Sequence, residues 1–193
     1  METGTSPRAS VEADAALLDR ITVTQQGETL AVRVGGGGAG EHGGAARASG
    51  PAVVTLSTTV LRSVAVSTGA RVRVSRMRGQ QVALSVTGTG AIDVAAVDAD
   101  QLQATVVGTG TMTLAGRAGR ARLLTNGPGT IDAGALVAND LTVRLDGPGE
   151  TRARARYTAQ VVDTGLGHVE VTGEAKCTVV APAGGPVECG KAL

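Results

Sequence analysis

The chain has 193 residues, and its 18 basic and 17 acidic side chains leave a formal net charge of +1. This balance argues against a strongly electrostatic partner, so we expect neither nucleic acid nor an anionic membrane as the ligand. Aromatic residues make up only 1% of the chain while Gly contributes 29 residues, which predicts a thin and regular core.

The first fifty residues differ in pattern from the rest. Residues 1–10 (METGTSPRAS) are polar and predict a disordered tag or trimmed start, with neither a signal peptide nor a transmembrane run of about 18 apolar residues. Within 11–34, two strand patterns joined around "QQGE" predict a β-hairpin. Residues 35–50 are Gly-rich and predict a flexible loop. This loop contains His42, for which the sequence indicates no catalytic or metal-binding partner. We expect the hairpin to cover or extend the N-terminal end of the following domain, because open strand edges aggregate.

From residue 51 to 190 the sequence repeats itself. A Gly-x-Gly pair or a close relative recurs, and the second glycines are separated by 20, 19, 20, 18 and 18 residues. An earlier copy, "STGARVRV", has Ala70 in place of the second Gly. Near-constant spacing of this kind predicts a repeat protein. The glycines of the corners are Gly88, Gly90, Gly108, Gly110, Gly127, Gly129, Gly147, Gly149, Gly165, Gly167 and Gly185.

Each repeat contains two stretches in which apolar residues alternate with polar ones. The alternation predicts strands with one buried face, as in Ile92 and Val94 or in Leu102, Ala104 and Val106, while Gln103 and Thr105 face outward. One such unit cannot bury its apolar face alone, but units stacked about 4.8 Å apart can. We therefore predict an all-β, single-chain β-helix (β-solenoid) of about seven rungs of about 20 residues, right-handed as crossover chirality favours.

The Gly-x-Gly pairs admit three interpretations: phosphate loops, Ca²⁺-binding repeats or structural corners. A phosphate loop needs a third Gly and a helix directly after it, whereas a strand pattern follows every copy here. A Ca²⁺ repeat needs an Asp in every turn. The position three after each second Gly is instead mixed, with Asp93, Thr113, Asp132, Arg152, Glu170 and Glu188. The pattern favours corners, where only Gly takes positive φ without steric cost.

The sequence singles out no catalytic residue, no cofactor site and no metal site. The nearest to one is the cluster His168, Glu170 and Glu188, because Glu170 and Glu188 should be neighbours on adjacent rungs. Such a cluster could bind a metal or share a proton, but like charges on a solvated rung are common without any role. Small basic patches follow from "RARARY" (152–157) and from Arg71, Arg73, Arg76 and Arg78.

Cys177 and Cys189 both fall at inward positions of the last rung by alignment with earlier rungs. Two interpretations are open: a disulfide that staples the last rung, which suits an exported protein, or two buried small apolar side chains.

Several stretches resemble a known family. "AALLDRITV" (15–23), "GETLAVRV" (27–34) and the series GTGAIDV, GTGTMTL and GPGTIDA are similar to the bacterial putative auto-transporter adhesin family, head GIN domain, formerly a domain of unknown function. The resemblance covers roughly residues 11–190. It implies an exported β-helical protein of the cell envelope, which is periplasmic, associated with the outer membrane or extracellular. Members of the family usually begin one or two strands earlier, behind a signal peptide or lipoprotein anchor, and neither precedes the domain here.

Together these features predict a non-enzymatic adhesive or structural protein that presents an extended surface to glycans or proteins. Two alternatives stay open. A polysaccharide-active β-helix enzyme would need a groove lined by convergent carboxylates, and a self-assembling filament would grow by edge-to-edge association of a solenoid that is otherwise monomeric.

Overall fold

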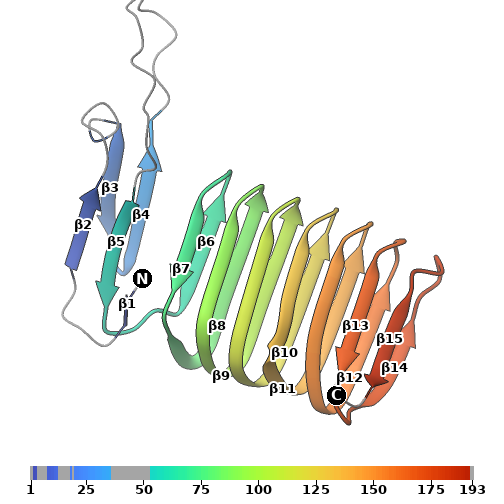
Figure 1. The fold of residues 1–193 in the computed structure, drawn as a ribbon. Coiled ribbons are helices and arrows are strands. Elements are labelled where there is room, and N and C mark those ends of the chain that lie inside the picture. The colour runs from blue at the N-terminus through green and yellow to red at the C-terminus, as the bar shows by residue number, and fades with distance from the viewer. Residues whose placement is uncertain (1, 4–7, 13–17, 19, 36–52, 192–193) are drawn as a thin grey trace, which may run out of the picture. The chain divides into compact units, whose positions relative to one another are not determined.

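The computed structural model describes residues 2–3, 8–12, 18, 20–35 and 53–191 (Figure 1). Contacts divide the chain into two compact units, which meet in the sequence at Ser57 and Thr58. Strand β1 (Glu2–Thr3) is followed by the strands of the smaller unit, which are β2 (Arg8–Glu12), β3 (Ile21–Gln26), β4 (Thr29–Val34) and β5 (Val53–Thr58). The described part of the chain contains no helix with the length and apolar character needed for a membrane span.

The smaller unit contains the predicted hairpin. β3 and β4 pair antiparallel from Ile21 opposite Val34 to Gln26 opposite Thr29. The two-residue turn begins with Gly27 at φ 58°, a conformation that glycine adopts easily. β2 pairs antiparallel with β5, so residues 8–10 form a strand inside the stretch that the sequence predicted to be disordered. Most of the predicted Gly-rich loop, including His42, lies outside the described residues.

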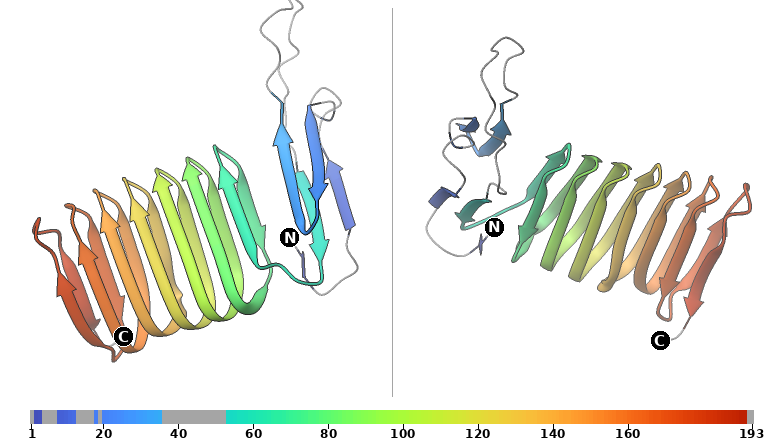
Figure 2. Two further views of the ribbon diagram at one scale, coloured as in Figure 1. Left: turned by 180° about the vertical axis from the view of Figure 1, so that it is seen from behind. Right: turned by 45° about the horizontal axis from the view of Figure 1, so that its top comes forward.

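The larger unit is a β-solenoid, which confirms the predicted fold. Its strands pair in parallel, each with the strand of the next rung, and in the views of Figures 1 and 2 each rung folds into two layers joined by a bend. The strands are β6 (Ser63–Ser67), β7 (Arg71–Val74), β8 (Met77–Gly88), β9 (Ala91–Gly108), β10 (Thr111–Asn126), β11 (Thr130–Asp146), β12 (Glu150–Asp163), β13 (His168–Thr172), β14 (Lys176–Val180) and β15 (Val187–Lys191).

Pairing between rungs keeps equivalent residues in columns. One inward column has seven successive members, one for each of the about seven rungs that the sequence predicted, and about six complete turns join them. These partners are Val72, Ile92, Met112, Ile131, Thr151, Val169 and Val187. The repeat spacing of 18–20 residues is therefore the length of one turn of the coil.

The core consists of these inward columns. The apolar residues that the alternation predicted to point inward are buried. They are Val82, Leu84, Val86, Ile92, Val94, Leu102, Ala104, Val106, Met112, Leu114, Leu141, Val143, Leu145, Val169 and Val171. Met77, Val97 and Leu136 fill the bend between the two strands of a rung. Burial of each large aliphatic side chain contributes roughly 1.5–3 kcal/mol, so stacking of the rungs drives folding.

Three buried positions are polar, which the alternation did not predict. Thr125 and Thr151 are fully buried and share a hydrogen bond of 3.0 Å between their hydroxyl oxygens, which satisfies both groups. Asp163 is also 0% exposed and occupies the column of Val106 and Leu145. Its Oδ1 accepts a hydrogen bond from the Gly165 N–H at 2.9 Å, while Oδ2 has no hydrogen-bond partner within the described residues.

In four of the corners the first glycine is required by backbone conformation, whereas at Gly165 it is required by space, because a Cβ there would lie 2.2 Å from the Gly147 carbonyl oxygen. Gly108 has φ +103°, where a side chain would be strained. Gly88, Gly127 and Gly147 share this conformation. The first corner differs, because Thr68 takes this position at φ 69° and is the one non-glycine residue with positive φ in the described chain.

The second glycine of a corner is required by space instead, which corrects the sequence argument from positive φ. Gly110 does not have positive φ, but a Cβ there would lie 2.4 Å from Val86 Cγ1 and 2.9 Å from the Gly90 carbonyl oxygen. Gly129 and Gly149 meet the same kind of overlap with the preceding corner. Each corner thus rests on the one before it at backbone contact distance.

The substitution Gly110→Ala tests this assignment. The added methyl overlaps backbone atoms that cannot rotate away, so we expect a loss of about 1–3 kcal/mol in the free energy of unfolding, measured by urea denaturation. Gly79→Ala is the matched control, because its nearest atom would lie at 3.5 Å and its φ is not positive. If both variants unfold at the wild-type urea concentration, close stacking does not explain the second glycine.

Candidate binding surface

One outward column runs along the whole solenoid beside the corner. Its successive partners are Arg73, Asp93, Thr113, Asp132, Arg152, Glu170 and Glu188. Two basic, four acidic and one neutral side chain share this column, and the Arg152 guanidinium lies 2.9 Å from Glu150 Oε1 and 3.6 Å from Glu170 Oε2. The column is therefore a face of mixed charge, because its acidic members are interrupted by Thr113 and Arg152.

The cluster of His168, Glu170 and Glu188 is only partly assembled. Glu170 and Glu188 are direct partners in the column, whereas His168 pairs with Glu150 in the neighbouring column. Among the described residues, no three His, Cys, Asp or Glu side chains come close enough together to hold a metal ion. The structure therefore brings the two glutamates side by side without gathering the three side chains into a metal-binding group.

A second set of charges lies where the rungs bend, between the two strands. Arg78, Asp98 and Arg117 are successive partners of three rungs. Arg117 donates from Nε to Asp98 Oδ1 at 2.8 Å and from Nη2 to Oδ2 at 3.2 Å. Arg78 Nε lies 3.3 Å from the same Oδ2. The hydrogen bond from Arg117, followed by the charges of Arg117 and Arg78, lowers the pKa of Asp98 and keeps its carboxylate ionised.

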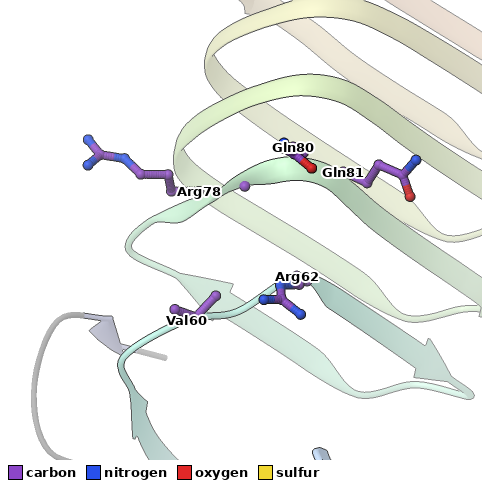
Figure 3. Close-up of a pocket in the computed structure, with 6 residues that line it drawn as sticks. Val60, Arg62, Arg78, Gln80 and Gln81 are labelled. Carbon is purple, nitrogen blue, oxygen red and sulfur yellow. The ribbon is translucent and has the colours of Figure 1, made fainter.

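Two hollows adjoin this set. A hollow of about 300 Å³ is lined by four charged residues and three small or apolar ones, which are Arg76, Arg78, Asp98 and Arg117 with Ala96, Val97 and Gly116. A larger one, of about 460 Å³, lies at the first rung between Val60, Arg62, Arg78 and residues 79–81 (Figure 3). Here β6 pairs with β8 only from Ala83 onward, which leaves residues 79–81 at the border of the hollow. Arg78 and Gln81 extend in different directions in Figure 3, so the lining does not converge on one point.

We call Arg62, Arg76, Arg78 and Arg117, with Asp98 between them, the arginine edge. The basic patch predicted from the sequence includes Arg76 and Arg78, but the links of Arg78 and Arg117 to Asp98 were not predicted. The sequence spacing could have predicted these contacts. Asp98 follows Arg78 by 20 residues and Arg117 follows Asp98 by 19, and both separations equal the repeat length.

A further cluster of polar side chains lies on the outer face formed by the second strand segment of each rung, after the bend, which we call the second face. Arg144 Nε donates to Asp146 Oδ2 at 2.9 Å, and the Thr164 hydroxyl of the next rung donates to Asp146 Oδ1. The hydrogen bonds from Arg144 and from Thr164 lower the pKa of Asp146, and the hydrogen bond to Asp146 raises the pKa of Arg144.

The two cysteines lie at the last rung. Cys177 is the register partner of Ala159 and Cys189 that of Val171, both of which are buried. The structure joins Cys177 and Cys189 by a disulfide with a Cα–Cα distance of 6.2 Å. The bond links β14 to β15 across the thin core and closes the last rung.

Comparison with protein families identifies the chain. A family model described as "Putative auto-transporter adhesin, head GIN domain" matches residues 1–175. A search of curated proteins gave no match.

Solved structures share the fold at low sequence identity. A putative adhesin from Bacteroides fragilis NCTC 9343 has a TM-score of 0.84 at 18% identity, with 95% of this chain and 83% of that chain covered. A putative adhesin from Parabacteroides distasonis ATCC 8503 has a TM-score of 0.68 at 16% identity, with 97% and 86% covered. A putative lipid binding protein from the same organism has a TM-score of 0.70 at 15% identity, with 98% and 87% covered.

The double substitution Cys177→Ser with Cys189→Ser tests the staple. The bond closes a loop with a sequence separation of 12 residues, so its loss should lower the free energy of unfolding by about 3 kcal/mol, measured by urea denaturation. A thiol reductant should lower the wild-type midpoint to that of the variant and leave the variant unchanged. A wild-type midpoint that does not respond to the reductant would contradict a staple.

The substitution Asp146→Asn tests the ion pair on the second face. Because folding lowers the pKa of Asp146, its ionised form stabilises the protein above the unfolded pKa, about 3.9, and this contribution disappears as the pH falls through the folded pKa. We expect the variant to melt below the wild type at pH 7 and the difference to shrink by pH 2.5. Asp100→Asn is the control, and a difference for Asp146→Asn that is the same at both pH values would contradict this assignment.

Proposed function

Because the chain belongs to the family described as putative auto-transporter adhesin, head GIN domain, we propose that it is a non-enzymatic adhesin of the cell envelope. Its β-solenoid presents an extended surface to glycan or protein partners. The observation that carries the proposal is the register of the outward columns, which repeats exposed side chains from rung to rung.

A repeating surface suits adhesion for a physical reason. Neighbouring rungs lie about 4.8 Å apart, so each outward column holds its side chains at a constant spacing on a stiff backbone. A polymer with its own repeat can then contact several rungs at once. The first contact raises the effective concentration of the polymer at the neighbouring rungs, which strengthens overall binding. Individual exposed contacts are weak, but their sum over several rungs supports retention.

The competing enzymatic hypothesis rests on Glu170 and Glu188. In a glycosidase, two carboxylates flank the scissile bond as acid and base or nucleophile. Here Glu170 lies beside the guanidinium of Arg152, in a column exposed on the outer face. Acid–base catalysis needs a pair of carboxylates sheltered from solvent, so a glutamate that is ion-paired on an open face supports surface binding better.

Export to the cell envelope belongs to the same proposal. The disulfide between Cys177 and Cys189 supports it, because such bonds persist in oxidising compartments and are rare in the cytosol.

The proposal predicts that beads coated with the chain adhere to some members of a panel of immobilised polysaccharides and matrix proteins. We expect retention well above that of uncoated beads, without release of new reducing ends from any polysaccharide. Beads coated with Gly110→Ala at a temperature where this variant is unfolded are the control for a folded surface.

Two outcomes would contradict the proposal. Retention no higher than that of uncoated beads across the panel would remove adhesion. Hydrolysis that disappears in a variant with Glu170→Gln and Glu188→Gln would establish the enzyme instead. Particles that grow with protein concentration in light scattering would favour the filament alternative.

A further inference from the structure

The charge of the solenoid is unevenly distributed along its length. The net charge of +1 for the chain conceals a stretch from Thr58 to Ile92 with five arginines and neither aspartate nor glutamate. These are Arg62, Arg71, Arg73, Arg76 and Arg78. The first acidic residues of the solenoid follow on β9, where Asp98 pairs with Arg78 and Arg117. The first rungs therefore carry a local positive charge that the overall balance does not reveal.

The arginine edge keeps donor groups available in spite of Asp98. One carboxylate lies between two guanidinium groups, which leaves an excess of one positive charge on this triad. Arg78 reaches Asp98 through Nε, and Arg117 through Nε and one terminal nitrogen, so Asp98 does not engage the other N–H groups of either side chain. The side chains of Arg78 and Arg117 are 69% and 76% exposed.

The two hollows extend this donor set to both sides. Arg62 lines the larger hollow together with Gln80 and Gln81, which add neutral amide donors. Arg76 lines the smaller one. Arg78 borders both hollows, so they form a continuous surface across the first rungs on which the one carboxylate is already engaged by arginine.

This arrangement suits a particular class of ligand. The planar fork of a guanidinium matches the two oxygens of a carboxylate or a sulfate. Arg78 and Arg117 lie two rungs apart, which is about 10 Å at the spacing of neighbouring strands. Charges that recur along an extended acidic polysaccharide can engage such side chains in succession. Single-stranded nucleic acid would instead require aromatic stacking platforms. The only Tyr of the chain, Tyr157, lies on β12, two rungs beyond Arg117, and its ring already carries the guanidinium of Arg156, so it offers no series of stacking platforms.

We propose that the arginine edge is the binding site of this adhesin for acidic polysaccharides, whose carboxylate or sulfate groups it recognises. The inference rests on the adhesive function proposed above and adds the ligand class and the residues. Arg78 and Arg117 contact the anionic groups, Asp98 holds the two guanidinium groups in place, and Arg62 extends the site over the larger hollow.

Binding of the intact chain to three immobilised polymers tests the proposal. Polygalacturonate presents carboxylates, dextran sulfate presents sulfates, and unmodified dextran is the neutral reference. We expect binding to at least one of the acidic polymers, an affinity that falls as salt rises, and no binding to dextran. The acidic polymer that binds identifies which anionic group the site recognises.

Matched variants locate the site. Arg78→Gln with Arg117→Gln should lower the affinity for the acidic polymer about tenfold or more, because two charge-assisted contacts are lost. Arg144→Gln with Arg152→Gln removes two exposed, ion-paired arginines from other rungs and should change the affinity less than about twofold. Arg62→Gln breaks no ion pair within the described residues and should give an intermediate loss even if the first double variant folds poorly. Circular dichroism and thermal melting establish which variants are folded.

The contrary results are distinct. An equal loss in both double variants would show attraction by overall charge and overturn the site. Equal binding to dextran, or adhesion of coated beads without binding to either acidic polymer, would overturn this ligand class and leave the adhesive function intact. Absence of adhesion to every member of the panel would remove both proposals. Tighter binding to duplex DNA than to either acidic polymer would assign the edge to nucleic acid.

Discussion

The close contact between successive corners determines the rest of the solenoid. At Gly110 and Gly129 the backbone lies so near the carbonyl oxygens of the preceding corner that a Cβ would overlap them, at 2.9 Å and 2.8 Å from the nearest of these oxygens. This contact holds consecutive rungs at strand spacing and limits how far one rung can slide along the next. Because a slip by one residue would turn every inward side chain outward, the corner also protects the core. The nearly constant repeat length follows from the same constraint.

Rigid register in turn organises the surface. On the surface, side chains that are far apart in sequence meet when they occupy one column, as in the triad of Arg78, Asp98 and Arg117. Thr158 likewise donates to Asp140 of the preceding rung at 2.7 Å. Such exposed pairs contribute little to stability, so outward positions can change without loss of the fold. A solenoid therefore separates its structural residues, which point inward or form corners, from the residues that are available for recognition.

The last rungs show how the coil ends. A β-solenoid terminates in strand edges that can pair with other chains, and short strands reduce this risk. β14 and β15 have five residues each and are joined by the disulfide of Cys177 and Cys189. Asp163 replaces an aliphatic residue in the inward column just before this end, and its carboxylate accepts the Gly165 N–H at the penultimate corner. The disulfide therefore holds β14 and β15 together covalently, where the thin aliphatic core of the last rung offers few apolar contacts to do so.

The sequence alone determined the architecture of this protein. The alternation of Val, Leu and Ile predicts which face of each strand is buried. The constant spacing of the Gly-x-Gly pairs predicts the length of a rung and which residues stack in one column. The tertiary structure decided what the repeat length does not encode. The contact of Thr125 with Thr151 crosses the core, and the different roles of the two glycines depend on how tightly corners stack. The repeat spacing could have predicted that Arg78 and Arg117 lie beside Asp98. The geometry of these contacts and the hollows beside them depend instead on how sharply each rung bends. Periodicity states which residues are neighbours along the solenoid axis, whereas the width and bending of the coil decide which side chains meet across it.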